Sequence, residues 1–231
     1  IPVGIHRSDY LSLYQNSDIP KEIYKAKNEK KKILVVLGYN SPLNWFESYT
    51  SLHLNWTSQI TFLEDIVKLS KNLNNTFIVV RYKSLNWTHN EYFKKIIDKI
   101  NSCENVIISS NYKESFYSYK LCANADLVIA KHTSLADECL SIGIPVLFYD
   151  YTHNMKQIIS GAFDYSPSRL MCNNFDDLLA KSISLLFKNE SELKDDISEL
   201  NKKIYNVDKV DKKENIKNKI IGNLENLINS I

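Results

Sequence analysis

Short, continuous apolar runs recur along the chain and alternate with segments of a different pattern. The runs are rich in Val, Ile and Leu, and they occupy residues 32–37, 76–80, 105–109, 126–130 and 145–148. Because a strand between two layers of helices is apolar on both faces, such runs predict the buried strands of a parallel sheet. The intervening segments repeat apolar residues every three or four positions, which predicts helices over residues 60–73, 91–101, 112–123 and 134–142.

Strand and helix alternate five times, which predicts an α/β fold with a doubly wound, Rossmann-like parallel sheet. A further helix is predicted over 175–187, capped by Asn173 or Asn174. The pattern divides the chain into three parts. Residues 1–31 form a linker or the remnant of a preceding domain, residues 32–188 form the Rossmann-like domain, and residues 189–231 form an amphipathic helical extension.

The lysine-rich segment KEIYKAKNEKKK at residues 21–32 is typical of a linker or a short solvated helix before the first strand. The chain begins Ile-Pro-Val-Gly without a methionine, which indicates a piece of a longer protein and leaves open whether an acceptor-side domain precedes it.

Composition narrows the class of protein. A formal net charge of +2 gives no overall basic field, so no nucleic-acid partner is expected. The four cysteines have no zinc-ligand spacing, and we expect free thiols in a reducing compartment. Neither a signal peptide nor a run of about 20 apolar residues occurs, which predicts a cytoplasmic protein.

Polar residues follow the predicted strands, at the edge of a parallel sheet where ligands bind. Gly38 and Tyr39 follow the first strand, and Arg81 and Lys83 follow the second. Residues two apart in a strand share a face, so Arg81 and Lys83 are expected to emerge together. Each could neutralise a phosphate or form a solvated strand end. Ser110 and Asn111, after the third strand, could contact a base or be ordinary loop residues.

The cluster after the fourth strand contains His132, Thr133 and Ser134 and leads directly into a helix. Ser134 followed by Asp137 is a capping pattern, and the free amides at such a helix start could also bind a phosphate. His132 is either a phosphate donor or an ordinary surface histidine.

Glu138 lies one turn into this helix, where its carboxylate could accept two hydrogen bonds from a ribose diol or form part of a solvated face. Gly143 then predicts a left-handed helix end.

The segment TSLADECLSIGIPVLFYD at residues 133–150 resembles the donor-binding segment of GT-B glycosyltransferases. In that family a hydroxyl-rich turn opens a helix, a Glu five residues before a Gly binds the ribose of the donor, and G-x-P-V leads into the next strand. Glu138 and Gly143 have this separation. The resemblance extends over residues 32–188 and implies the C-terminal, nucleotide-sugar-binding half of such an enzyme, similar to bacterial surface-polysaccharide transferases. It also implies that Gly38 lets the backbone approach the donor.

Some features depart from the family. The carboxylate seven residues from the ribose-binding Glu in many retaining members is absent, since Ala130, Pro145 and Val146 are not acidic. No His-Pro follows the second strand, and no paired aspartates for a metal stand at a strand end. We therefore expect metal-independent transfer without a cofactor. The base of inverting members comes from the other domain and is not assigned.

The sequence thus predicts the donor domain of a glycosyltransferase whose partners are a nucleotide sugar and a glycan or lipid-linked acceptor. The predicted donor-binding residues are Gly38, Tyr39, Arg81, Lys83, His132, Thr133, Ser134 and Glu138. A sugar-nucleotide epimerase, a polyol-phosphate transferase and a non-catalytic nucleotide- or protein-binding module remain as alternatives. The lysines of the C-terminal extension leave open a peripheral contact with the inner face of a membrane, and the oligomeric state is not predicted.

Overall fold

A computed structural model of the chain describes residues 6–15, 19–38, 56–130, 133–150, 169–188, 195–199 and 216–229. Its centre is a six-stranded sheet, parallel throughout, with the strand order β3-β2-β1-β4-β5-β6. The strands are β1 (Lys32–Leu37), β2 (Thr76–Arg81), β3 (Val106–Ile108), β4 (Leu127–Ala130), β5 (Val146–Tyr149) and β6 (Met171–Cys172). The predicted doubly wound α/β sheet is confirmed. The two-residue strand β6 was not predicted, because a run this short has no recognisable apolar pattern.

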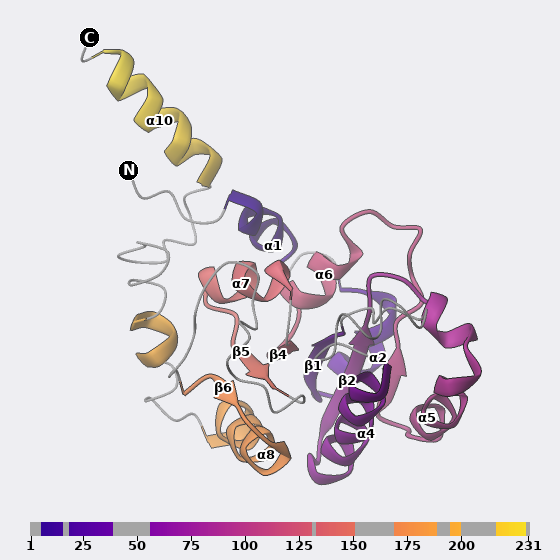
Figure 1. Ribbon diagram of the computed structural model, residues 1–231. Coiled ribbons are helices and arrows are strands. Elements are labelled where there is room, and N and C mark those ends of the chain that lie inside the picture. The colour runs from indigo at the N-terminus through magenta and orange to yellow at the C-terminus, as the bar shows by residue number, and fades with distance from the viewer. Residues whose placement is uncertain are drawn as a thin grey trace.

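Helices cover both faces of the sheet (Figure 1). On one face α4 (Trp56–Asn72) contacts α5 (Glu91–Asn101) and α8 (Phe175–Ile183). On the other, α6 (Tyr117–Ala123) contacts both α1 (Asp9–Tyr14) and α7 (Ser134–Ser141). Three shorter turns accompany them: η1 (His6–Ser8), η3 (Asn86–His89) and the π-helical η4 (Ser184–Lys188). This arrangement leaves the carboxyl ends of the strands as one edge of the domain.

Helix α6 begins five residues later than the apolar spacing predicts. Phe116, immediately before it, has a φ of 61°, a left-handed conformation that cannot continue a helix through this residue. Helix α8 begins at the predicted position, because the Asn174 side chain accepts a hydrogen bond from the Asp177 amide at 2.9 Å.

The segment before β1 belongs to the same hydrophobic core as the sheet. Leu11 of α1 is fully buried, and α2 (Lys21–Asn28) buries Ile23 and Ala26 while it contacts β1 and β2. Of the two interpretations of residues 21–32, a linker or a short solvated helix, the short helix is observed, but it is not wholly solvated, because two apolar residues three positions apart attach it to the core. The division of the chain at residue 31 stays a prediction.

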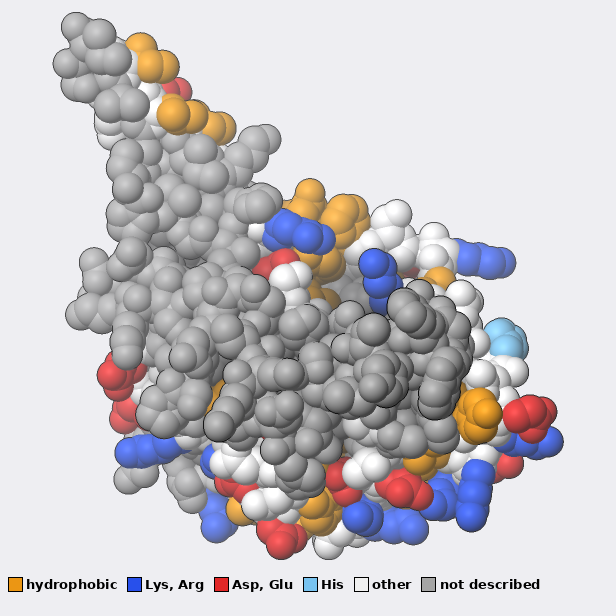
Figure 2. All heavy atoms as spheres, viewed as in Figure 1, with side chains coloured by type: hydrophobic (Ala, Val, Ile, Leu, Met, Phe, Trp, Pro, Cys, Tyr) orange, Lys and Arg blue, Asp and Glu red, His pale blue; other side chains and the backbone are white. Residues whose placement is uncertain are grey.

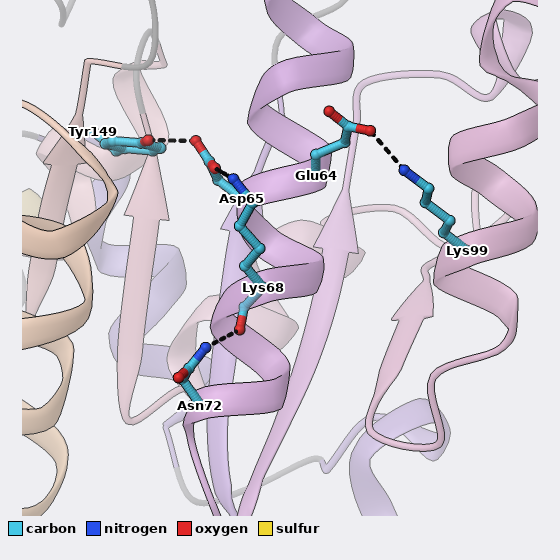
Figure 3. Close-up of polar contacts among 6 residues, drawn as sticks. All are labelled: Glu64, Asp65, Lys68, Asn72, Lys99 and Tyr149. Carbon is cyan, nitrogen blue, oxygen red and sulfur yellow. Dashed lines mark hydrogen bonds and ion pairs between the residues drawn. The ribbon is translucent and has the colours of Figure 1, made fainter.

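Polar side chains fix α4 to its neighbours (Figure 3). The Tyr149 hydroxyl at the end of β5 donates a hydrogen bond to Asp65 at 2.6 Å, and Lys68 pairs with Asp65 at 3.0 Å. Burial and this carboxylate raise the pKa of Tyr149. On the other side of α4, Lys99 of α5 pairs with Glu64 at 2.7 Å. These contacts explain why the helix holds its place against both β5 and α5.

The C-terminal extension is described in two pieces, a helical segment at 195–199 and helix α10 (Ile216–Ile228). Figure 1 shows α10 extending away from the sheet. It exposes Ile221, Leu224 and Ile228. No helix among the described residues is both long and apolar enough to cross a membrane. The four cysteines, all within the described ranges, form no disulfide.

Candidate functional site at the carboxyl edge of the sheet

The structure places most of the predicted site residues at the carboxyl edge of the sheet. Gly38 follows β1, Arg81 ends β2, and Thr133 stands between β4 and α7. Tyr39 and His132 lie outside the described residues.

Arg81 is 7% exposed, and its side chain faces the protein interior. Its Nε donates to the Ser118 hydroxyl at 3.0 Å and one terminal nitrogen donates to the Ser109 hydroxyl at 3.1 Å. The guanidinium also lies 4.1 Å from the centroid of the Tyr112 ring. Among the described residues no carboxylate forms an ion pair with it. Arg81 is therefore a fixed, buried positive charge at the sheet edge.

Lys83 does not share this environment. Strand β2 ends at Arg81, so Lys83 lies beyond the strand and its side chain is exposed. The two residues were expected to emerge together, but the structure buries one and exposes the other. The alternation of a strand applies only while the strand continues.

Gly38 is required by the packing of Tyr82. A Cβ atom at position 38 would lie 2.1 Å from Cζ of the Tyr82 ring, far inside van der Waals contact. Tyr82 is buried, its ring centroid lies 4.7 Å from that of Trp87, and its carbonyl accepts a hydrogen bond from the Tyr112 hydroxyl at 2.8 Å. This packing is sufficient to explain why residue 38 is a glycine. The approach of the backbone at Gly38 to a donor stays a prediction.

The start of α7 differs from the predicted cap by one residue. Thr133, not Ser134, is the N-cap, and its hydroxyl accepts a hydrogen bond from the Leu135 amide at 3.3 Å. Threonine takes this place because its backbone is extended, with a φ of −160°. Asp137 lies four residues after this N-cap, whereas a capping box needs its acidic residue three residues after the N-cap. Its side chain is 2% exposed. A phosphate at this helix start stays a prediction.

Glu138 is 2% exposed, so it is not part of a solvated helix face. One carboxylate oxygen lies 3.8 Å from Nε of Arg7, whose own side chain is 53% exposed. The Tyr119 hydroxyl of α6 forms a hydrogen bond with the same carboxylate, and burial together with Glu138 raises the pKa of Tyr119. The carboxylate is thus buried between η1, α6 and α7, beside an arginine that reaches solvent.

Sequence reasoning missed Arg7, Tyr119 and Glu22, because residues 1–31 were assigned to a linker or domain remnant and residues 112–123 to a helix without a role in donor binding. Glu22 of α2 accepts a hydrogen bond from the Ser110 amide at 3.2 Å. The Asn111 side chain donates to Glu114 at 3.1 Å. Both residues predicted to contact a base therefore already have protein partners. The tyrosines of the segment YKESFYSYK were the available signal, since Tyr112, Tyr117 and Tyr119 all lie in this polar network.

Comparison with known proteins identifies the fold. No protein-family model matches the chain, and no curated protein matches it. Among solved structures, it is similar to a putative UDP-N-acetylglucosamine 2-epimerase from Listeria monocytogenes, with a TM-score of 0.56 and 14% identity over 84% of this chain and 46% of that one.

Two further structures were solved with a nucleotide sugar. The UDP-GlcNAc 2-epimerase from Neisseria meningitidis, bound to UDP-GlcNAc, gives a TM-score of 0.53 and 14% identity over 84% of this chain and 48% of that one. The trehalose-6-phosphate structure from E. coli, bound with UDP-2-fluoro glucose, gives a TM-score of 0.55 and 9% identity over 96% of this chain and 50% of that one.

The chain thus has a GT-B-type, Rossmann-like fold and spans about half the length of the structures it matches. Sequence identity this low shows the fold alone. Among the described residues there is no group of three or more His, Cys, Asp or Glu side chains that could hold a metal ion. Transfer without a metal stays a prediction.

Proposed function

We propose that the chain is the donor-binding part of a glycosyltransferase and binds a nucleotide sugar at the carboxyl edge of its sheet. The observation that carries this proposal is the Glu138 carboxylate, which is buried five residues before the left-handed Gly143. Its partner Arg7 is half exposed and can exchange with a ligand. A carboxylate in this position can accept hydrogen bonds from both hydroxyls of a ribose. The fold shared with structures solved with UDP-sugars supports the same ligand class.

The remaining residues suit the phosphates of such a ligand. The start of α7 offers backbone amides and the positive end of a helix dipole, capped by Thr133. Arg81 adds a buried positive charge without an ion pair among the described residues, and Lys83 adds an exposed one. As the glycosidic bond breaks, negative charge develops on the leaving phosphate, and these groups would stabilise it electrostatically. The acceptor, in this proposal, is a surface glycan or its lipid-linked precursor.

A binding screen tests the proposal. UDP, CDP, GDP, dTDP, CMP and their sugar conjugates are added to the wild-type chain and to Glu138→Gln, and affinity is measured by calorimetry. We expect at least one nucleotide class to bind the wild type, and the variant to lose about 1–3 kcal/mol of binding free energy, the scale of hydrogen bonds to a charged group. Glu104→Gln, an exposed acid after α5, is the matched control and should leave the affinity unchanged.

Equal affinity of Glu138→Gln and the wild type would remove the ribose assignment. Binding of CDP-alcohols in preference to sugar nucleotides would support a polyol-phosphate transferase instead. If no nucleotide binds, a protein-binding module becomes the better interpretation of the same fold.

A second candidate is favoured by the likeness to two UDP-GlcNAc 2-epimerases. Incubation of the chain with UDP-GlcNAc, followed by proton NMR, separates the two functions. Inversion at C2 of the sugar supports the epimerase, and an acceptor-dependent release of UDP supports the transferase.

A further inference from the structure

Three aromatic side chains form a cluster where α1 meets the start of α6. The Tyr10 and Phe116 rings stack with their centroids 4.5 Å apart and an interplanar angle of 23°. Tyr119 packs edge-on against both, at 5.7 Å from Tyr10 and 5.9 Å from Phe116. We call these three residues the aromatic platform. The rings hold one another in place and present a fixed apolar surface.

The platform reaches solvent. Tyr10 is 37% exposed and Phe116 is 43% exposed, while Tyr119 is 7% exposed beneath them. Figure 2 shows hydrophobic side chains at the surface of this part of the molecule, beside a Lys or Arg side chain. A large stacked aromatic pair left accessible to water is typical of a surface that contacts a ligand or partner.

The platform is continuous with the proposed donor site. Tyr119 joins the two, because its ring packs against Phe116 while its hydroxyl is bonded to Glu138. In the proposed donor site the phosphates lie at the start of α7 and the ribose diol lies at Glu138. The base is attached to the ribose and projects beyond it, away from the phosphates. Helix α6, which carries Tyr119 and directly follows Phe116, packs against α7, so the platform lies on the immediate neighbour of the helix that carries Glu138.

The residues expected to bind the base have other partners. The Ser110 amide is bonded to Glu22, and the Asn111 side chain is bonded to Glu114. Reading the edge of a base with these groups would require breaking contacts that hold the loop after β3. Stacking on the platform needs no such change.

We propose that the aromatic platform binds the base of the donor nucleotide by stacking, with Phe116 as the main contact. This proposal rests on the proposed function, since it assumes that a nucleotide ribose lies at Glu138. Stacking accepts any base, because every base has a flat π face, and it favours larger rings. The site therefore binds purine and pyrimidine nucleotides alike, and selectivity for the donor comes from its sugar.

The experiment compares ligands that differ only in the base. Affinities of UMP, AMP and base-free ribose 5-phosphate are measured for the wild type and for Phe116→Asn. Asparagine removes the ring and tolerates the left-handed backbone found at residue 116. We expect the variant to bind UMP and AMP about 5- to 150-fold more weakly, the range that base–aromatic stacking gives, and to bind ribose 5-phosphate as the wild type does.

Two controls accompany this variant. Tyr92→Leu removes an exposed tyrosine from α5 on the opposite face and should change none of the three affinities. Urea unfolding of Phe116→Asn establishes that the variant is folded, and Tyr10→Leu gives a second test should it not fold, with a smaller loss of nucleotide affinity expected.

Each other outcome overturns the proposal in a distinguishable way. Unchanged UMP affinity in Phe116→Asn, with a loss in Glu138→Gln, rejects the platform and retains the donor site. An equal loss for UMP and ribose 5-phosphate places the effect at the ribose. A wild-type dimer that Phe116→Asn converts to a monomer assigns the platform to a second copy of the chain. If the wild type binds none of the three ligands, the proposed function fails and the platform assignment fails with it.

Discussion

Two of the buried charged side chains near the carboxyl ends of the strands, Arg81 and Glu138, have different kinds of partners. Arg81 bonds to Ser109 and Ser118 and lies against the Tyr112 ring, and all of these belong to the β3–α6 part of the domain. Glu138 bonds to Tyr119 and pairs at 3.8 Å with Arg7, which is half exposed. Arg81 is held by hydrogen bonds without an ion pair among the described residues, whereas Glu138 has an ion-pair partner that is half exposed.

The difference separates a structural charge from an exchangeable one. Two hydroxyls hold Arg81, that of the buried Ser109 and that of the half-buried Ser118, so Arg81 contributes to stability whether or not it also attracts a phosphate. Separating an exposed arginine from its carboxylate costs the arginine little free energy, because water replaces the carboxylate as its partner. Glu138 can thus offer its carboxylate to a ligand while the fold stays intact.

The largest expected effect comes from Arg81→Met, which removes the charge and leaves the buried Ser109 hydroxyl and the half-buried Ser118 hydroxyl without their donor. We expect a loss of about 2–4 kcal/mol in the free energy of unfolding, measured by urea denaturation. Lys83→Met, at the exposed neighbour, should stay within about 0.5 kcal/mol of the wild type. Equal losses in the two variants would remove the distinction between a structural and an exposed charge.

Gly38→Ala tests the packing next to Arg81. Its Cβ would overlap the ring of Tyr82, and we expect a loss of about 1–3 kcal/mol from overpacking. The same substitution in a Tyr82→Ala background should cost much less, since the overlapping ring is gone. Gly222→Ala in α10, with no atom within 4 Å of the new Cβ, should instead stabilise its helix by about 0.5–1 kcal/mol. An equal cost in both backgrounds would show that the backbone, not Tyr82, requires the glycine.

Much of the fold could be predicted from the sequence, because buried strands and amphipathic helices have strong periodic patterns. Strand β1 and helix α5 begin and end where the pattern indicates. The left-handed end of α7 at Gly143, with a φ of 81°, follows from the absence of a side chain. The missed features are those that local pattern does not encode, such as the two-residue strand β6 and the left-handed Phe116.

The candidate site could be predicted only in part. The position of Glu138 relative to Gly143 is a local spacing and is visible in the sequence. Its contact with Arg7 joins residues 131 positions apart, and that between Glu22 and Ser110 joins residues 88 apart. Such contacts depend on how η1, α1 and α2 pack on the rest of the domain, and the apolar residues of such short segments do not indicate which neighbour they pack against.

The ionisation of two tyrosines further tests the surroundings of Glu138, with Tyr119 as the tyrosine beside it and Tyr117 as the reference. Burial and the nearby Glu22 raise the pKa of Tyr117 to about 12, and burial and Glu138 raise that of Tyr119. Tyrosines in the unfolded chain ionise near pH 10. The stabilisation that the raised tyrosine pKa values provide is therefore complete below that pH and is lost as the pH rises from about 10 to 12. Absorbance at 295 nm should show these tyrosines ionising only as the chain unfolds. Glu138→Gln should lower the pKa of Tyr119 and leave that of Tyr117 unchanged.

The smallest expected effect on stability is that of Arg7→Ala. The pair with Glu138 spans 3.8 Å, and the arginine is 53% exposed, so solvent screening limits its contribution to about 0–1 kcal/mol. Nucleotide affinity should rise modestly in this variant, since the ribose no longer competes with the guanidinium for the carboxylate. Denaturation and calorimetry on the same sample measure both quantities. A large loss of stability would mean that Arg7 is as integral as Arg81, and a loss of affinity would mean that it contacts the donor instead of competing with it.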